Sequence, residues 1–93
     1  MNKTGSKTKI SLINEHGIHF TLGNDFENEI EFKVDIYNCI NNTENTEEIL
    51  QVINKHSKYG YKWSIYYIDE LLLIFKKEDK LGNKHYLHIE FNN

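Results

Sequence analysis

The chain has 93 residues, a formal net charge of −3 and a hydrophobic content of 39%. That length fits one small domain over 1–93, and the apolar content excludes disorder as the main state. The lone Cys39 excludes an internal disulfide framework. Because no apolar run follows the basic first residues, we expect no signal peptide, no membrane contact and a cytoplasmic location.

Two short strands are expected near the start of the chain. Residues 1–7 are predicted to form a flexible polar tail. The segments 9–13 and 18–22 each place alternate apolar residues on one face. The turn at 14–17 joins them, with Gly17 available for a positive φ.

The stretch from 29 to 37 gives the clearest strand prediction. Its apolar residues are Ile30, Phe32, Val34 and Ile36, and a charged residue separates each from the next. A strict period of two is typical of a strand with one buried face and one wet face.

A loop followed by a helix is expected over 41–60. Asn45 and Glu48 have the spacing of a capping box, and Gly60 is a natural C-terminal stop. The apolar stripe of this helix consists of Ile49, Val52, Ile53 and His56.

Three more strands are predicted over 61–68, 71–77 and 84–91. The first two carry apolar residues on both faces, so they should be central in a sheet or half-covered by a partner. The predicted fold is therefore α+β, with two antiparallel meanders flanking one helix (βββ-α-βββ) and the helix packed on one face. A helix of about 13 residues covers only part of six strands, so sheet curvature, a dimer mate or a target is needed to cover the rest.

The histidines do not form a recognisable metal motif. His85 and His88 lie three residues apart, so on a strand they point to opposite faces. A composite site of His19, His88 and Glu90 would require the second and last strands to be neighbours. We expect exposed strand histidines with no resident metal, no cofactor and no catalytic group; a small metal- or ligand-binding enzyme built on these three residues is the alternative.

Charge is distributed unevenly along the chain. The segment 24–48 carries eight acidic residues and one lysine, whereas 55–86 carries seven lysines and four acidic residues. On the predicted strand, Glu29, Glu31 and Asp35 would form a row of carboxylates spaced about 7 Å per two residues. Such a row resembles the phosphates of one nucleic-acid strand in its charge spacing.

This row predicts binding to a basic protein surface, because it would steer and dock onto a nucleic-acid-binding groove. The predicted partner-binding residues are Glu29, Glu31, Asp35, Glu47 and Glu48, with Tyr66 and Tyr86 as aromatic anchors. Sequence-specific contact with nucleic acid is not expected, because the chain has no arginine.

The chain is small and acidic, with 12 Asn, 12 Ile and 11 Lys but no Arg, Ala or Pro. In size and composition it resembles the small inhibitor proteins that phages make against bacterial defence systems, anti-CRISPR proteins among them. The resemblance implies that it binds a host nuclease without performing chemistry. An immunity protein or antitoxin that neutralises a toxin is the alternative.

Overall fold

The computed structural model describes residues 8–91, so the predicted tail at 1–7 lies outside the described residues. The main elements are β1 (Thr8–Asn14), β2 (His19–Phe20), α1 (Glu29–Asn42), α2 (Thr46–His56), β3 (Ser64–Ile68), β4 (Leu72–Glu78) and β5 (Lys84–Phe91). Short 3-10 turns, η1 (Leu22–Asn24) and η2 (Lys58–Gly60), lie on either side of the helical pair. Neither described helix is long and apolar enough to cross a bilayer.

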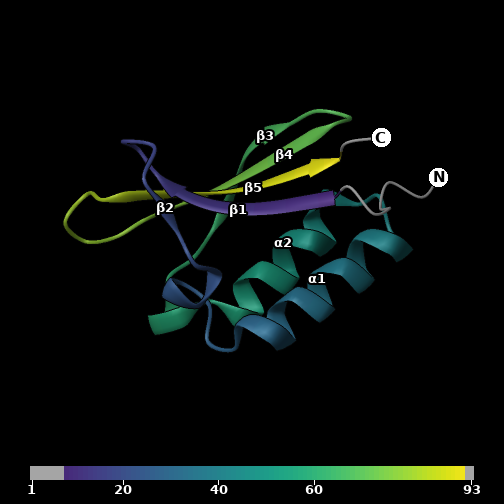
Figure 1. The fold of residues 1–93 in the computed structure, drawn as a ribbon, viewed down its shortest axis with the longest axis horizontal. Helices are drawn as coiled ribbons and strands as arrows, with labels where there is room; N and C mark the ends of the chain where they lie inside the picture. The colour runs from purple at the N-terminus through teal and green to yellow at the C-terminus, as the bar shows by residue number, and fades with distance from the viewer. Residues whose placement is uncertain (1–7, 92–93) are drawn as a thin grey trace.

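The five strands form one antiparallel sheet in the order β2-β1-β5-β4-β3. Both helices lie on the same face of this sheet, and the opposite face is open (Figure 1). The α+β class and the second meander, β3-β4-β5, are confirmed. The βββ-α-βββ order is wrong, because one of the six predicted strands is a helix and β1 pairs with β5 across the whole chain.

The predicted strand at 29–37 is in fact the first part of α1. The helix buries Phe32, Ile36 and Ile40, which recur every four residues and share one helical face. Ile30 and Val34 remain 77% and 53% exposed. Within the alternating pattern, Phe32 and Ile36 also have the four-residue spacing of one helical face. The helix buries these two residues and leaves Ile30 and Val34 in water.

Local capping explains why this segment is a helix. The side chain of Asn28 accepts a hydrogen bond from the backbone N–H of Glu31 at 3.0 Å. Glu29 and Glu31 lie in the first turn, where carboxylates interact favourably with the helix dipole. Glu29 also pairs with Lys33 one turn later, at 3.7 Å.

The helix predicted within 41–60 is confirmed as α2, although it ends at His56 rather than at Gly60. The side chain of Asn45 caps α2, but it accepts from the backbone N–H of Glu47. The carboxylate of Glu48 accepts instead from the hydroxyl of Thr43, at 3.3 Å, so the reciprocal half of the capping box is absent. Ile49, Ile53 and His56 form the buried stripe.

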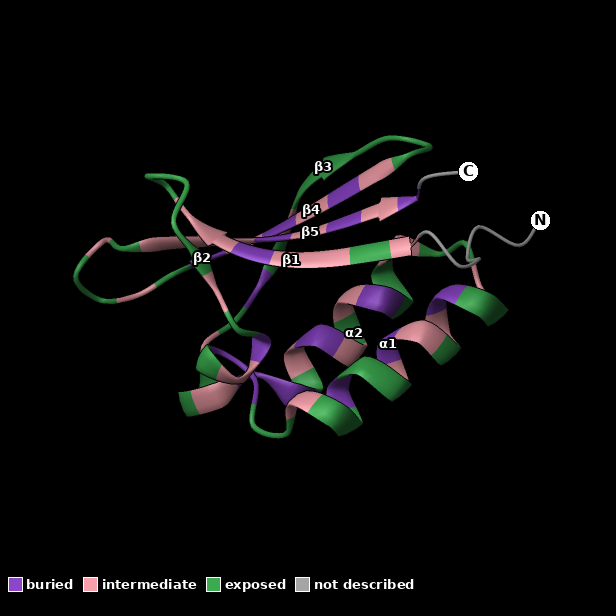
Figure 2. Cartoon of the chain, in the orientation of Figure 1, coloured by how far each residue is buried: buried purple, intermediate pink, exposed green. Residues whose placement is uncertain are grey.

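The core lies between the helices and the sheet (Figure 2). Phe26 stacks on Phe32 with ring centroids 4.0 Å apart and on Trp63 at 5.4 Å. Phe75 and Leu87 supply the facing side chains from the central strands, and both are fully buried. The aromatic stack thus joins the loop before α1 to the start of the second meander.

Replacing the α1 cap tests the helical assignment. Asn28→Ala should lower the free energy of unfolding by about 1 kcal/mol, because it leaves the N–H of Glu31 without its acceptor. Asn38→Ala, at an exposed position within the same helix, is the matched control and should be neutral or slightly stabilising. Urea unfolding followed by circular dichroism measures both. Equal stabilities of the two variants would contradict a helix that begins at residue 29.

Candidate functional site

The predicted row of carboxylates does not exist, because its three members lie on a helix. Glu29 is used internally, since its carboxylate accepts from the N–H of Gly23 at 3.1 Å and pairs with Lys33. Asp35 lies 2.7 Å from His56 Nε2 and links the two helices. Glu31 is the one member of the three that is exposed. The expectation of a single acidic face built on these residues is therefore wrong.

Glu47 and Glu48 lie at the other end of the helical layer. They begin α2, directly after the connection from the end of α1. Glu29 and Glu31 begin α1, whose 14 residues span about 21 Å at 1.5 Å per residue. The five predicted acidic residues are thus divided between two ends of the helical layer, and Glu47 and Glu48 lie at the end where Glu44 and Thr46 line a groove.

Tyr66 and Tyr86, the predicted aromatic anchors, do come together. Their rings meet edge to face on the open face of the sheet, with centroids 5.3 Å apart. The ammonium of Lys76 lies 5.8 Å from the centre of the Tyr66 ring. Tyr66 is 58% exposed, so much of this aromatic pair is available to solvent.

The composite of His19, His88 and Glu90 is not assembled. β1 separates β2 from β5, so the strands that carry these residues are not neighbours. Among residues 8–91, the three side chains whose ligand atoms converge within 4.8 Å are Glu31, Asp35 and His56. The short Asp35–His56 contact already accounts for two of them as a bridge between α1 and α2.

His88 lies on the open face of β5, opposite Ser11 and Ile74. Partial burial lowers the pKa of His88 from its ordinary value of 6.5; the carboxylate of Glu90 acts in the opposite direction, and His19 adds to the lowering. The neutral imidazole is therefore favoured in the folded protein.

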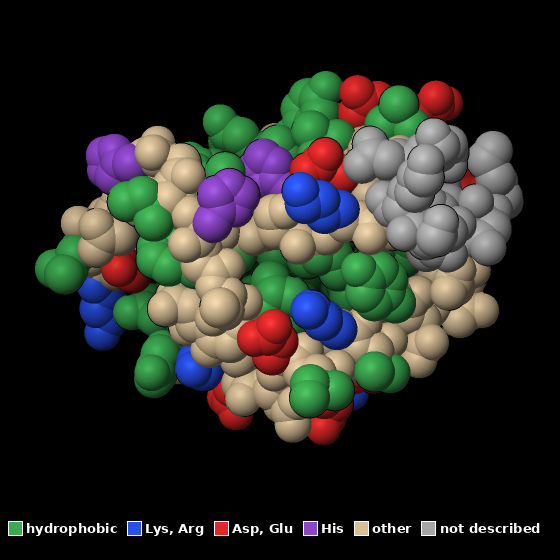
Figure 3. All heavy atoms as spheres, viewed as in Figure 1, with side chains coloured by type: hydrophobic (Ala, Val, Ile, Leu, Met, Phe, Trp, Pro, Cys, Tyr) green, Lys and Arg blue, Asp and Glu red, His purple; other side chains and the backbone are tan. Residues whose placement is uncertain are grey.

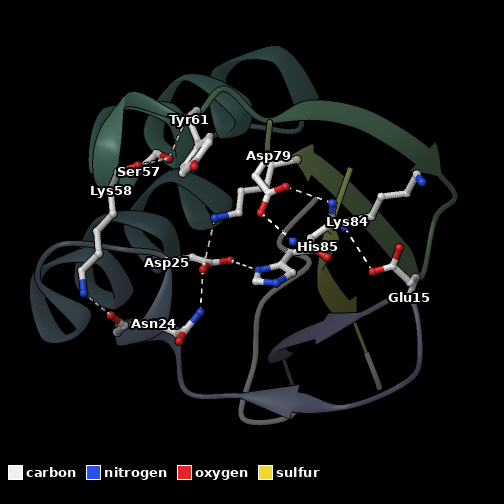
Figure 4. Close-up of polar contacts among 12 residues, drawn as sticks. Glu15, Asn24, Asp25, Ser57, Lys58, Tyr61, Asp79, Lys84 and His85 are labelled. Carbon is white, nitrogen blue, oxygen red and sulfur yellow. Dashed lines mark hydrogen bonds and ion pairs between the residues drawn. The ribbon is translucent and has the colours of Figure 1, made fainter. Parts of the chain in front are cut away.

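A buried polar cluster that the sequence did not predict surrounds Asp25. The Asp25 carboxylate accepts a hydrogen bond from His85 Nδ1 at 2.7 Å and one from the side-chain amide of Asn24 at 2.8 Å. The ammonium of Lys77 lies 3.2 Å from Asp25 Oδ1, the oxygen that also accepts from Asn24. Asp25 and Lys77 are only 2% and 7% exposed. Figure 4 shows Asp25 reaching toward His85 from the opposite segment of the chain.

Neighbouring contacts keep this cluster rigid. The Lys77 ammonium lies 4.6 Å from the centre of the Tyr61 ring, and the His85 ring stacks on Phe20 at 4.9 Å. The backbone carbonyl of Asp25 accepts from the N–H of Lys58 at 2.9 Å.

An aspartate–histidine pair is part of many acid–base sites, but such a site also needs a reactive group in a cleft. Here Lys77 and Asn24 also hold the carboxylate, and the two cavities described below are lined by other residues. The cluster serves as an internal fastening between the loop before α1 and strands β4 and β5.

A groove of about 220 Å³ opens between the α1–α2 connection and the β3–β4 turn. We call it the acidic groove. Its lining consists of apolar Ile40, Ile49, Ile68, Leu73 and Phe91, the hydroxyl residues Thr43 and Thr46, and the acidic Glu44, Asp69 and Glu70. None of these described lining residues is basic. Figure 3 shows acidic side chains beside hydrophobic ones along the upper edge, over β3 and the β3–β4 turn.

A second cavity, of about 230 Å³, lies between β1, β2 and the start of α1. Its charged lining residues are Glu29 and Lys33, which pair with each other. Their charges are therefore largely satisfied within the chain. The lining of the acidic groove carries carboxylates from two separate loops around an apolar floor.

Comparison with known proteins gives no match to a family model, to a curated protein or to a solved structure.

A double-mutant cycle tests the fastening role of Asp25. Asp25→Ala should lower the free energy of unfolding by about 3–5 kcal/mol, because it leaves a buried ammonium without a counter-charge. Adding Lys77→Met removes that ammonium while keeping much of its packing, so the double variant should regain about 1–3 kcal/mol of coupling energy. Urea unfolding of the four proteins gives the cycle. Strictly additive effects would contradict an ion pair between these residues.

The lowered pKa of His88 predicts a pH dependence of stability. The unfolded chain takes up a proton at His88 near pH 6.5, before the folded protein does. The contribution of neutral His88 to the free energy of unfolding is therefore complete above pH 6.5. It is lost as the pH falls from 6.5 toward the lower pKa that His88 has in the folded protein. The melting temperature should fall between pH 7.5 and pH 5.5 in both proteins, and it should fall less for His88→Gln than for the wild type. An equal fall in melting temperature in both proteins would contradict the prediction.

Proposed function

We propose that this chain is a non-enzymatic protein-binding inhibitor that takes a basic segment of a partner protein into the acidic groove. The observation that carries the proposal is the groove itself, in which carboxylates from Glu44, Asp69 and Glu70 border an apolar floor. A segment that alternates lysine or arginine with aliphatic residues complements such a surface in both charge and apolarity. Glu47 and Glu48, at the start of α2, add negative charge at the same end.

The internal use of the titratable clusters supports a binding role over an enzymatic one. Asp25, Lys77 and His85 satisfy one another across three segments. Asp35 and His56 do the same between the helices. Function is then carried by surface side chains, and the acidic groove combines an apolar floor with charge of one sign among its described lining residues.

The nature of the partner follows from charge and from the resemblance in size and composition. A nucleic-acid-binding enzyme of a host defence system offers basic grooves, as expected for an anti-CRISPR-like inhibitor made by a phage or mobile element and acting in the host cytoplasm. A basic toxin is the second candidate, with this chain as its immunity protein or antitoxin. Both classes share the same recognition chemistry, in which a cationic surface meets the carboxylates of the groove.

A matched pair of variants tests this role. The groove variant combines Glu44→Lys with Asp69→Asn. The control combines Glu27→Lys with Asp79→Asn, which makes the same change in charge at the opposite end of the molecule. Asp79 also matches Asp69 structurally, because each accepts backbone hydrogen bonds within its own strand-connecting turn.

Both proteins and the wild type are used as bait in lysate of a bacterial host, and the captured protein is then titrated calorimetrically. The groove variant should bind the captured protein at least about tenfold more weakly, since like charges then face its basic segment. The control should keep wild-type affinity, and added salt should weaken the wild-type complex. Equal affinities for both variants, or an affinity insensitive to salt, would contradict the proposal.

A further inference from the structure

Strand β3 forms one border of the sheet and has a single neighbour, β4, among the described residues. Its residues read Ser-Ile-Tyr-Tyr-Ile, without a charge or a proline. Tyr66, Tyr67 and Ile68 are 58%, 46% and 57% exposed, and Leu71 in the following turn is 56% exposed. The two strands with apolar residues on both faces were expected to be central in the sheet or half-covered by a partner. The structure gives β4 a central position but leaves β3 uncovered.

Proteins usually protect such a strand from pairing with other chains. The common devices are inward-pointing charges, proline, very short strands and bulges. β3 has one of these, a bulge between Ile65 and Tyr67. The bulge increases the local twist and lets Tyr66 lie against Tyr86 on the open face. It leaves the strand neutral and its outer backbone edge unpaired by any described strand.

Charges at the two ends of β3 identify what pairs with it. Exposed Lys62 precedes the strand, and exposed Asp69 and Glu70 follow it. Consider two copies of β3 that pair antiparallel about a two-fold axis at Tyr66. Residues the same number of positions before and after Tyr66 then face each other across the two copies. Lys62 of each copy then meets Glu70 of the other, and a shift of one residue brings it to Asp69 instead. A parallel pairing would place lysine against lysine and carboxylate against carboxylate.

We infer that a second copy of this chain pairs antiparallel with β3 and extends the sheet across a two-fold axis. The pairing is isologous, because the same segment serves both copies. It satisfies the outer backbone groups of β3 and covers apolar side chains that the helices leave exposed. It also makes the two Tyr66–Tyr86 pairs neighbours at the axis. The inference does not require the acidic groove to bind a partner, although Ile68, Asp69 and Glu70 belong to both surfaces.

Particle mass, measured by sedimentation equilibrium over a wide concentration range, tests the inference. The wild type should approach twice the 11.1 kDa chain mass. Lys62→Glu and Glu70→Lys should each raise the dimer dissociation constant at least about tenfold, because two attractive contacts become repulsive. The double variant carrying both changes should dimerise better than either single variant, since the charges again alternate.

Lys80→Glu is the control, because Lys80 is exposed in the β4–β5 connection, away from β3. It should leave the dissociation constant unchanged. Circular dichroism of each variant establishes that the fold is retained. A wild-type mass of one chain up to millimolar concentration would overturn the inference. So would single reversals without effect, or effects that simply add in the double variant. Glu44→Lys alone, which changes the groove outside β3 and the turn that follows it, should still dimerise, and this separates the result from a failure of the proposed function.

Discussion

The Asp25 carboxylate joins the helical layer to the sheet at one buried point. It accepts from His85 on β5, faces Lys77 on β4 and is held by Asn24 beside it. The segment that carries it leads directly into Phe26, whose ring stacks on both Phe32 and Trp63. The position of α1 over the sheet is thus supported by one buried carboxylate that side chains from two strands hold. Removing one member of such a set is costly, because the remaining charge is stranded in a medium of low dielectric.

This fastening determines which surfaces remain for function. Asp25, Lys77 and His85 contact one another inside the fold. These titratable side chains therefore stabilise the packing of the loop before α1 on the sheet. Two of the remaining surfaces lie together at the β3 end of the molecule. There the sheet extends past its helical cover, and the β3–β4 turn and the α1–α2 connection enclose the acidic groove. An unpaired apolar strand and a carboxylate-bordered groove share this end, and both favour recognition of protein.

Sequence reasoning succeeded where a segment's pattern and its local chemistry agree. In α2, the apolar stripe, the cap at Asn45 and the acidic first turn all indicate a helix. It failed at α1, where Ile30, Phe32, Val34 and Ile36 alternate as a strand would. The cap at Asn28, followed three residues later by Glu31, was the local signal for a helix. The alternation of apolar residues favoured a strand, but the cap at Asn28 and the four-residue spacing that buries Phe32 and Ile36 favoured a helix. The helix is the structure that forms.

Other features depend on long-range contacts that no local pattern encodes. His85 and Asp25 are 60 residues apart in the chain, and the pairing of β1 with β5 joins its two ends. The predicted acidic face failed for the same reason as the strand, since carboxylates at alternate positions diverge around a helix. Tyr66 and Tyr86 were brought together because β3 and β5 flank β4. That proximity required the correct strand order, which the sequence did not specify.

Amide hydrogen exchange of β3 as a function of protein concentration tests the central claim most directly, namely that this strand is a recognition edge. At low concentration, the outward-facing amides within Ser64–Ile68 should exchange fast while those of β5, hydrogen-bonded on both sides, stay protected. As concentration rises, the account predicts that the β3 amides become protected and those of the exposed β4–β5 connection do not change. Outward β3 amides that exchange at the same fast rate at every concentration would contradict it.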